Sequence, residues 1–424
     1  MSVKPQTKSW LKVVLATSLF IIPPACAIQS NIINAVEPTV KQKTQNQTDS
    51  QAYTDVQNLV NMGPRVAGTP TNEKASAYIE QQYRKAGYRT RIQTFTYSKF
   101  RDFGSSLTVD GRNIKASAFK GSAPGKLSAR LVTVPNFGRA NDFATVNVKG
   151  AIALVKRGEI RFSEKVTNAI DAGAIGVVIV NNKAGNLTYG TLTQNSQIPV
   201  LGISGDEGNK LYAEAPPERS PINLNANGQN IDVTGRNVIA YQEGVTQPRV
   251  ILGGHFDSVE GAPGANDNAS GTAVVLDIAR KVSKTPLARQ AWFIAFDGEE
   301  DGLHGSRAFV DAATPQFLSE LKGMMNFDMV GVNNKLLIGG SSDLTKLAQV
   351  VQPKAELFGA SYANGASDHA PFAAKGVPIL FFYRGMEPNY HSPNDKTVDP
   401  KLLDETSQAG LDIFKRLISK KPGF

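Results

Sequence analysis

The second half of the chain constrains the fold most, because short apolar segments with the pattern of strands alternate there with segments that have the pattern of helices. This alternation runs from about residue 229 to the end of the 424-residue chain. The expected strands are 237–241, 250–253, 291–296, 324–330 and 379–383, and the expected helices are 270–282, 344–357 and 401–417. The pattern predicts an α/β fold, with a mostly parallel mixed sheet and helices on both faces.

Carboxylates and histidines follow these strands, at the edge of the sheet where ligands of such folds bind. All four histidines of the chain lie between residues 255 and 391. Taken singly, each acidic or histidine residue could be a cap or a turn residue, but together they predict a metal site on the rim of the sheet. The residues concerned are His255, Asp257, Asp267, Glu299, Glu300, Asp328 and His391.

The residue types at this edge suit zinc. A neutral imidazole is a good zinc ligand, and Asp257, two residues after His255, can fix the tautomer of that ring. The only cysteine, Cys26, would be lost with a signal peptide, so the ligands of a zinc site must be His, Asp and Glu.

Two other kinds of hydrolase site are excluded by motif. The chain has no His-Glu-x-x-His helix motif and no Gly-x-Ser-x-Gly nucleophile turn. Ser367, Asp368 and His369 are consecutive and cannot easily converge as a triad, so we expect them to form the wall and outer shell of the site. We expect His304 to be a surface residue.

The first 27 residues have the pattern of a secretory signal peptide. Three lysines precede a mostly apolar run at 13–22, which is too short to span a bilayer, and Ala25-Cys26-Ala27 fits a cleavage site. We therefore expect a secreted or periplasmic protein with no stable membrane anchor after signal cleavage. A lipoprotein with lipidated Cys26 is the alternative, although Pro23 and Pro24 fit that signal poorly.

Charge and composition indicate which partners to expect. The net charge of +9 falls to +6 when the three lysines of the signal are removed, and the remaining basic residues are scattered. Without a dense basic run and interleaved aromatic residues, nucleic-acid binding is not expected. No amphipathic interface segment stands out, so we expect a monomer.

The rest of the chain divides into three regions. Residues 28–50 are rich in Asn, Gln and Thr and are expected to form a disordered leader or linker. Residues 51–104 are expected to form two helices and a strand that belong with 229–424 in one domain. The region 105–228 is β-rich and has no histidine, so we interpret it as an inserted domain.

The motifs at the sheet edge resemble those of the secreted co-catalytic di-zinc aminopeptidases, the bacterial leucine-aminopeptidase-like metallopeptidases. The matching motifs are Gly254 to Ser258, Gly264 to Gly271, Phe296 to Glu300, Asn326 to Gly331, Ser367 to Phe372 and Tyr390 to Asp395. Gly63-Pro64-Arg65 resembles the amino-terminal part of that family, and 150–158, 162–176 and 198–204 resemble a protease-associated domain. The resemblance implies a zinc-peptidase (phosphorylase/hydrolase-like) fold with an inserted protease-associated domain at 105–228.

The resemblance also implies a role for each site residue. One Zn²⁺ would be bound by His255 and Asp328, a second Zn²⁺ by Glu300 and His391, and Asp267 would bridge the two. Asp257 would hydrogen-bond His255 from the outer shell. Glu299 would be the general base, and Tyr390 would donate a hydrogen bond to the oxyanion. The substrates would be the amino termini of peptides or proteins.

Three alternatives remain on the same scaffold. The chain could be a carboxypeptidase or dipeptidase, or a glutaminyl cyclase, although cyclases work with one zinc and the full set of five ligands argues against that reading. A non-catalytic binding protein is the third, and it would typically have lost ligands or the base.

Overall fold

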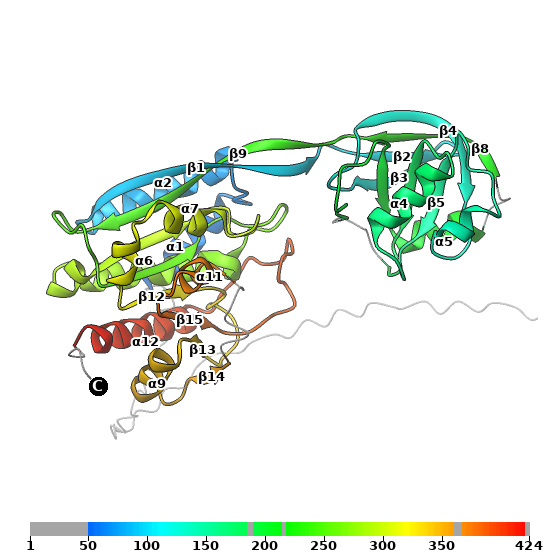
Figure 1. The fold of residues 1–424 in the computed structure, drawn as a ribbon. Helices are drawn as coiled ribbons and strands as arrows, with labels where there is room; N and C mark the ends of the chain where they lie inside the picture. Colours follow the sequence, from blue (N-terminus) through cyan, green and yellow to red (C-terminus); the bar gives the residue numbers. More distant parts are fainter. Residues whose placement is uncertain (1–49, 185–189, 214–217, 360–366, 420–424) are drawn as a thin grey trace, which may run out of the picture. The chain divides into compact units, whose positions relative to one another are not determined.

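The structure is a computed structural model that describes residues 50–184, 190–213, 218–359 and 367–419 (Figure 1). The predicted signal peptide at 1–27 and all but the last residue of the predicted leader at 28–50 lie outside these ranges. None of the helices within them has the length and apolar composition needed to cross a bilayer.

An eight-stranded mixed sheet organises the part of the chain that carries the predicted site. Its strand order is β1-β9-β11-β10-β12-β15-β13-β14, with parallel pairing from β11 through β10 and β12 to β15. β9 and β13 run antiparallel to their inner neighbours. The strands are β1 (Arg89–Asp102), β9 (Gly228–Tyr241), β10 (Val250–His255), β11 (Ala291–Phe296), β12 (Gly323–Phe327), β13 (Leu337–Gly340), β14 (Glu356–Phe358) and β15 (Ile379–Tyr383). The predicted mostly parallel mixed sheet is confirmed.

Helices cover both faces of this sheet (Figure 1), because each central strand buries side chains on both sides. In β10, Val250 and Leu252 belong to one hydrophobic cluster and Ile251 belongs to another. The first cluster packs under α1 (Gln51–Asn61), α2 (Pro70–Lys85), α6 (Ser270–Val282), α9 (Ser342–Val351) and α12 (Pro400–Ser419). The second packs under α7 (His304–Ala312), α8 (Pro315–Ser319) and α11 (His369–Ala374). Strands buried on both faces read as continuous apolar runs, which is why they stand out in the sequence.

Two of the predicted elements are too long. The strand expected at 324–330 ends at Phe327. The helix expected at 344–357 ends at Val351, and residues 356–358 form strand β14 instead. Pro353 lacks the backbone N–H that a continuing helix needs. The following residues pair in parallel with β13, so tertiary pairing overrides the apolar helical spacing of the sequence.

The inserted region forms a closed barrel, with the strand order β2-β3-β7-β6-β5-β4-β8. Its strands are β2 (Ser106–Val109), β3 (Arg112–Ala118), β4 (Gly125–Thr133), β5 (Ile152–Lys156), β6 (Gly176–Val180), β7 (Val200–Ile203) and β8 (Glu218–Ala226). The described residues of this region also form the helices α3 (Ala140–Phe143), α4 (Phe162–Asp171) and α5 (Gly205–Ala213). The barrel lies between β1 and β9 in the chain, and it has hydrophobic clusters of its own.

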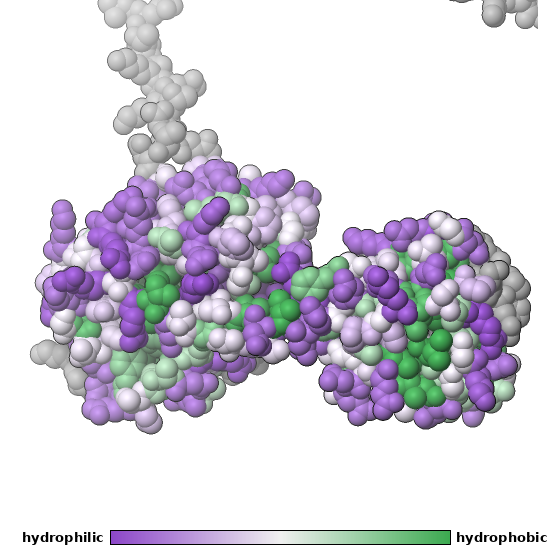
Figure 2. All heavy atoms as spheres, turned by 90° about the horizontal axis from the view of Figure 1, so that it is seen from above, coloured by the Kyte–Doolittle hydropathy of each residue, from purple (hydrophilic) through white to green (hydrophobic). Residues whose placement is uncertain are grey.

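The molecular surface is mainly hydrophilic on the face drawn in Figure 2, where the hydrophobic side chains that show gather in a few patches. Six large hydrophobic side chains among the described residues are exposed, and most of them lie in loops. They are Phe103, Ile175, Val350, Leu357, Met386 and Tyr390.

Close backbone packing at the start of α6 provides a test of this fold. A Cβ atom added at Gly271 would lie 2.0 Å from the carbonyl oxygen of Phe327 at the end of β12. Because backbone cannot easily move aside, Gly271→Ala should lower the free energy of unfolding by at least about 1–3 kcal/mol. Urea unfolding of the metal-free protein measures this, with Gly359→Ala as the control because a Cβ there meets nothing within 4 Å. Equal stability of the two variants would contradict the packing described here.

Candidate metal centre

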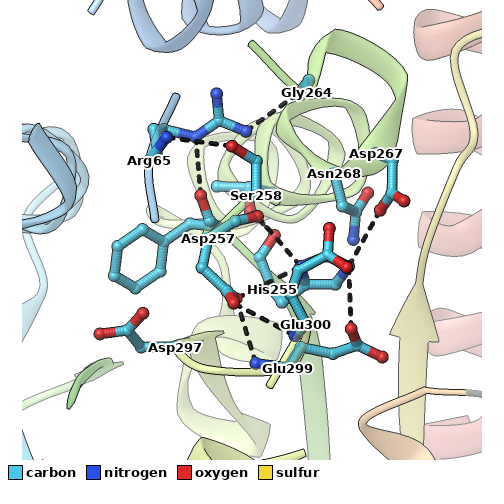
Figure 3. Close-up of polar contacts among 12 residues, drawn as sticks. Arg65, His255, Asp257, Ser258, Gly264, Asp267, Asn268, Asp297, Glu299 and Glu300 are labelled. Carbon is cyan, nitrogen blue, oxygen red and sulfur yellow. Dashed lines mark hydrogen bonds and ion pairs between the residues drawn. The ribbon is translucent and has the colours of Figure 1, made fainter. Parts of the chain in front are cut away.

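The predicted site residues converge at the carboxyl ends of three adjacent parallel strands. β10 extends two residues beyond its predicted end, so that His255 is its last residue, and Asp328 directly follows β12. Glu299 and Glu300 lie in the turn after β11 (Figure 3). Because parallel strands end at the same edge, residues far apart in sequence meet there.

The ring of His255 faces three carboxylates. Its Nε2 atom lies 3.3 Å from Asp267 Oδ1, 3.5 Å from Asp328 Oδ1 and 3.9 Å from Glu299 Oε2. Asp267 comes from a π-helical turn at Ala265–Ala269 that leads into α6, and its peptide bond to Asn268 is cis. One nitrogen therefore meets oxygen atoms from three different loops.

A second imidazole lies near the other carboxylate oxygen of Asp267. His391 Nε2 lies 3.1 Å from Asp267 Oδ2 and 3.0 Å from Glu300 Oε2. His391 adopts a left-handed φ of 54°, which is uncommon for a residue other than glycine. Asp267 therefore presents one oxygen to each of the two histidines.

Asp257 contacts both His255 and the turn that carries Glu299 and Glu300. Its Oδ1 atom lies 3.4 Å from His255 Nδ1, and its backbone oxygen lies 3.2 Å from the same nitrogen. Its carboxylate oxygens accept the backbone N–H groups of Glu299 and Glu300, each at 3.2 Å (Figure 3). Asp257 thus orients a ring and a turn at the same time.

The electrostatics of this edge favour cations. Burial raises the pKa of the Glu300 carboxyl to about 7, and the neighbouring Asp267 adds to the rise. Burial alone would lower the pKa of His391, but hydrogen bonds to Asp267 and Glu300 raise it to about 10. Carboxylates crowded in a low-dielectric site create a negative potential, which a divalent cation would neutralise.

The arrangement of donor atoms fits zinc. Two sets of three groups each bring one ligand atom within 4.8 Å of one another: His255 with Glu299 and Asp328, and His255 with Asp267 and Glu300. Within the described residues, Glu300 Oε1 and Asp328 Oδ1 are buried and accept no hydrogen bond. Buried carboxylate oxygens need partners, and imidazole and carboxylate donors are the ligands that zinc takes in proteins without cysteine.

Tyr390 lies at the open side of the site. Its ring stacks on the ring of His391, with centroids 3.7 Å apart and planes at 20°. Burial raises the pKa of its phenol above the usual value, and the nearby carboxylates of Asp267 and Glu300 add to this, so the hydroxyl keeps its proton.

Arg65 is a structural centre of the site that the sequence motifs did not indicate as such. Its side chain is fully buried, and its Nε donates to the carbonyl of Phe256 at 2.7 Å (Figure 3). Its two terminal nitrogens donate to the carbonyls of Pro263 and Gly264, the latter at 2.9 Å. The guanidinium thus binds both ends of the loop between His255 and Asp267. In the sequence, only the Gly-Pro-Arg motif drew attention to Arg65.

Asp395 and Asn268 hydrogen-bond to the backbone at or next to two of the ligand candidates, Asp267 and Asp328. The Asp395 carboxylate accepts the backbone N–H groups of Asn266 and Asp267, at 2.8 and 3.0 Å. The Asn268 amide donates to the carbonyl of Phe327 at 2.9 Å, directly before Asp328. Both residues belong to the recognised motifs, but spacing alone could not show which backbone groups they hold.

The remaining histidines have structural contacts. Ser367, Asp368 and His369 are fully buried, and Asn326 at the site end of β12 donates to the Ser367 hydroxyl at 2.9 Å. His304, which was expected at the surface, is partly exposed, and its ring stacks on that of Tyr97, with centroids 3.8 Å apart.

Two parts of the chain match the profiles of known protein families. Residues 237–413 match the profile of peptidase family M28, and residues 127–211 match that of the PA domain. Aminopeptidase YwaD of Bacillus subtilis is 32% identical over 382 residues, which cover 85% of this chain and 82% of that protein.

Two solved structures agree with these matches. The aminopeptidase from Aneurinibacillus sp. strain AM-1 has a TM-score of 0.67 and 33% identity, over 88% of this chain and 93% of that one. The zinc aminopeptidase BSAP from Bacillus subtilis has a TM-score of 0.72 and 29% identity, over 88% and 96% of the two chains. The similarity therefore spans the mixed sheet as well as the inserted barrel.

Proposed function

Because the chain belongs to peptidase family M28 and contains a PA domain, we propose that it is an exported zinc aminopeptidase that hydrolyses the amino-terminal bond of peptides. The similar proteins named above are aminopeptidases, and one is a zinc enzyme. Export rests on the signal-peptide pattern of residues 1–27.

Two zinc ions per chain would share the site. His255 and Asp328 would hold one ion, Glu300 and His391 the other, and Asp267 would bridge them. The observation that carries this proposal is the placement of Asp267, whose two oxygens lie 3.3 and 3.1 Å from the nitrogens of two different histidines. A carboxylate that faces two ligand sets is the bridge that a two-metal site needs.

The bound zinc would supply Lewis acidity, which polarises a carbonyl oxygen and makes water a stronger acid. The protein residues would do the rest of the work. Glu299 would accept the proton of the attacking water at its carboxylate and then pass that proton to the leaving amine. Tyr390 would donate its hydroxyl proton in a hydrogen bond to the oxyanion, from its position on the ring of His391.

Asp257 would support this chemistry without touching the substrate. By accepting the N–H groups of Glu299 and Glu300, it would hold the base and one ligand at a fixed distance from His255. Hydrogen bonds of this kind behind a metal ligand orient it and raise its basicity.

Metal analysis together with a blocked substrate tests the proposal. The purified mature protein should contain close to two zinc ions per chain and release p-nitroaniline from aminoacyl-p-nitroanilides. Chelation should abolish this activity, restored zinc should return it, and amino-terminally acetylated substrates should stay intact.

Other outcomes would support the other enzymes on this scaffold. Release of carboxyl-terminal residues would indicate a carboxypeptidase, and cleavage of dipeptides alone would indicate a dipeptidase. One zinc with cyclisation of glutaminyl peptides would indicate a cyclase. No metal and no turnover of any peptide would contradict an enzyme and favour a binding protein.

A further inference from the structure

The turn that carries Glu299 and Glu300 is held by the strands that lead to the inserted barrel. This turn joins β11 to α7 and is closed by its own backbone. The carbonyl of Glu299 accepts the N–H groups of Gly302 and Leu303, at 2.8 and 2.9 Å, and the carbonyl of Gly298 accepts that of His304 at 3.0 Å. Such a turn moves as a unit, so contacts at its rim act on both glutamates.

The contacts at the rim come from the two-stranded ribbon formed by β1 and β9 (Figure 1). β1 and β9 pair along their whole length, from Arg89 opposite Tyr241 to Asp102 opposite Gly228. β9 pairs with β11 only at residues 238–240. Beyond that point the described part of the ribbon has no further strand partner, so side chains must fix its position.

Asp301, the residue after Glu300, interacts with two of these side chains. The hydroxyl of Tyr97 donates to Asp301 Oδ2 at 2.5 Å, and Lys99 Nζ lies 2.6 Å from Asp301 Oδ1. The Asp301 side chain is only 13% exposed, so the pair is partly shielded from water. Charge-assisted hydrogen bonds in such surroundings are stronger than those of an exposed ion pair.

Tyr97 also covers the turn with its ring. It stacks on His304 at 3.8 Å with planes at 14°, and a Cβ added at Gly298 would lie 3.2 Å from its hydroxyl. Tyr97 also packs in a small hydrophobic cluster with Ala67 and Val233. The ring is therefore fixed between the ribbon and the turn.

The partner strand holds the other end of the same turn. The backbone N–H of Arg236 in β9 donates to Asp297 Oδ2 at 2.8 Å. Asn72 donates to Asp297 Oδ1 at 2.8 Å. The ribbon therefore contacts the turn at both ends, at Asp297 and at Asp301. Between these two residues, the Asp257 carboxylate accepts the backbone N–H groups of the two glutamates.

We propose that Tyr97 and Lys99 are positioning residues for Glu299 and Glu300, acting through Asp301, and that the strands leading to the inserted barrel thereby contribute to catalysis. The proposal rests on the function proposed above, in which Glu299 is the base and Glu300 a ligand. A shift of about 1 Å in a catalytic group can cost about 100-fold in rate, so the anchor need not touch the substrate to matter.

The chain offers a matched pair of tyrosines for the test. Tyr97→Phe removes the hydrogen bond to Asp301 and keeps the stacked ring. Tyr78→Phe removes an equivalent hydrogen bond, since the Tyr78 hydroxyl donates to Asp55 Oδ1 at 2.6 Å between α1 and α2. Asp301→Asn, Lys99→Met and Lys99→Arg complete the set.

For each variant we would measure Tm, kcat and KM on an aminoacyl-p-nitroanilide, and the rate of zinc release to a chelator. Tyr97→Phe, Lys99→Met and Asp301→Asn should lower kcat by about 10-fold or more, leave KM within about 2-fold and speed zinc release. Lys99→Arg should restore kcat, because it keeps the ion pair. Tyr78→Phe should lower Tm alone.

Coupling between the variants separates this anchor from simple destabilisation. Tyr97→Phe combined with Asp301→Asn should be no slower than Asp301→Asn alone, because both act through one carboxylate. The proposal is overturned if Tyr97→Phe and Lys99→Met lower Tm as Tyr78→Phe does but keep the wild-type kcat and zinc release. A wild-type protein that binds zinc but turns over no peptide would refute the proposed function instead, and the zinc-release rates would still test the anchor.

Discussion

The Glu299→Gln variant is expected to keep its zinc and to lose about 10²–10⁴-fold in kcat, the range that general acid–base catalysis contributes. Gln has nearly the shape of Glu but cannot accept a proton at neutral pH. Glu299 Oε2 lies 3.9 Å from His255 Nε2, but Glu299 is not one of the five proposed ligands, so the metal content should not change. The rate on an aminoacyl-p-nitroanilide and elemental analysis of the same sample measure both quantities.

The pH dependence adds a second readout to this experiment. A base must be deprotonated to act, so the acidic limb of the kcat profile should disappear in Glu299→Gln. Glu320→Gln is the matched control, because Glu320 is exposed and its carboxylate only accepts the amide of Gln316 at 2.8 Å. It should behave as wild type.

Metal analysis also distinguishes the proposed role of Glu299 from its alternative. Glu299 belongs to one of the donor groups whose ligand atoms lie within 4.8 Å of one another, together with His255 and Asp328. If Glu299→Gln lost one zinc ion of two, Glu299 would be a ligand, and another residue would have to serve as base.

The sequence predicted the convergence of the site because its residues follow strands that are apolar throughout. The runs 250–253 and 291–296 have the pattern of buried strands, and parallel neighbours end at one edge. His255 and Glu300 therefore had to meet once the sheet was predicted correctly. Their roles came from the resemblance of the motifs, and these roles remain predictions that the variants test.

The framework behind the site could not be predicted in the same way. Arg65 precedes its partner Phe256 by 191 residues, and its partners are backbone carbonyls that no residue type reveals. The stacking of Tyr97 on His304 could not be predicted either, because the position of Tyr97 depends on how the β1–β9 ribbon lies on the turn. Similarly, the many strand-like segments of 105–228 predicted the inserted domain. Closure of the barrel could not be predicted, because it depends on pairing between distant strands, such as β2 with β8.

The Asp267→Asn variant is expected to lose at least one of the two proposed zinc ions and more than about 100-fold in activity. Loss of a partner behind a metal ligand already costs about 10–100-fold, so loss of a direct ligand should cost more. An amide offers one oxygen and one NH₂ group, and NH₂ carries hydrogens where a second lone pair is needed. The substituted side chain could therefore serve one side of the site but not both.

The substitution should leave the local fold intact, which makes the result interpretable. Asp395 holds the backbone N–H of Asp267 at 3.0 Å, and this bond does not involve the side chain that is changed. Asp277→Asn is the matched control: Asp277 is a buried carboxylate of α6 that interacts with Lys281 at 2.7 Å and with Ser407, away from the site. It should lower Tm and keep both zinc ions.

Zinc titration of the chelated Asp267→Asn protein then decides between a bridged pair and two independent sites. With a bridge, the ion that faces the NH₂ group loses its ligand and the other ion keeps only a neutral amide oxygen, so the affinity for each should fall. If Asp267→Asn still bound two zinc ions with wild-type affinity, Asp267 would not be a ligand. Loss of one ion with an unchanged affinity for the other would assign Asp267 to a single site. Either result would require a different explanation for its position between His255 and His391.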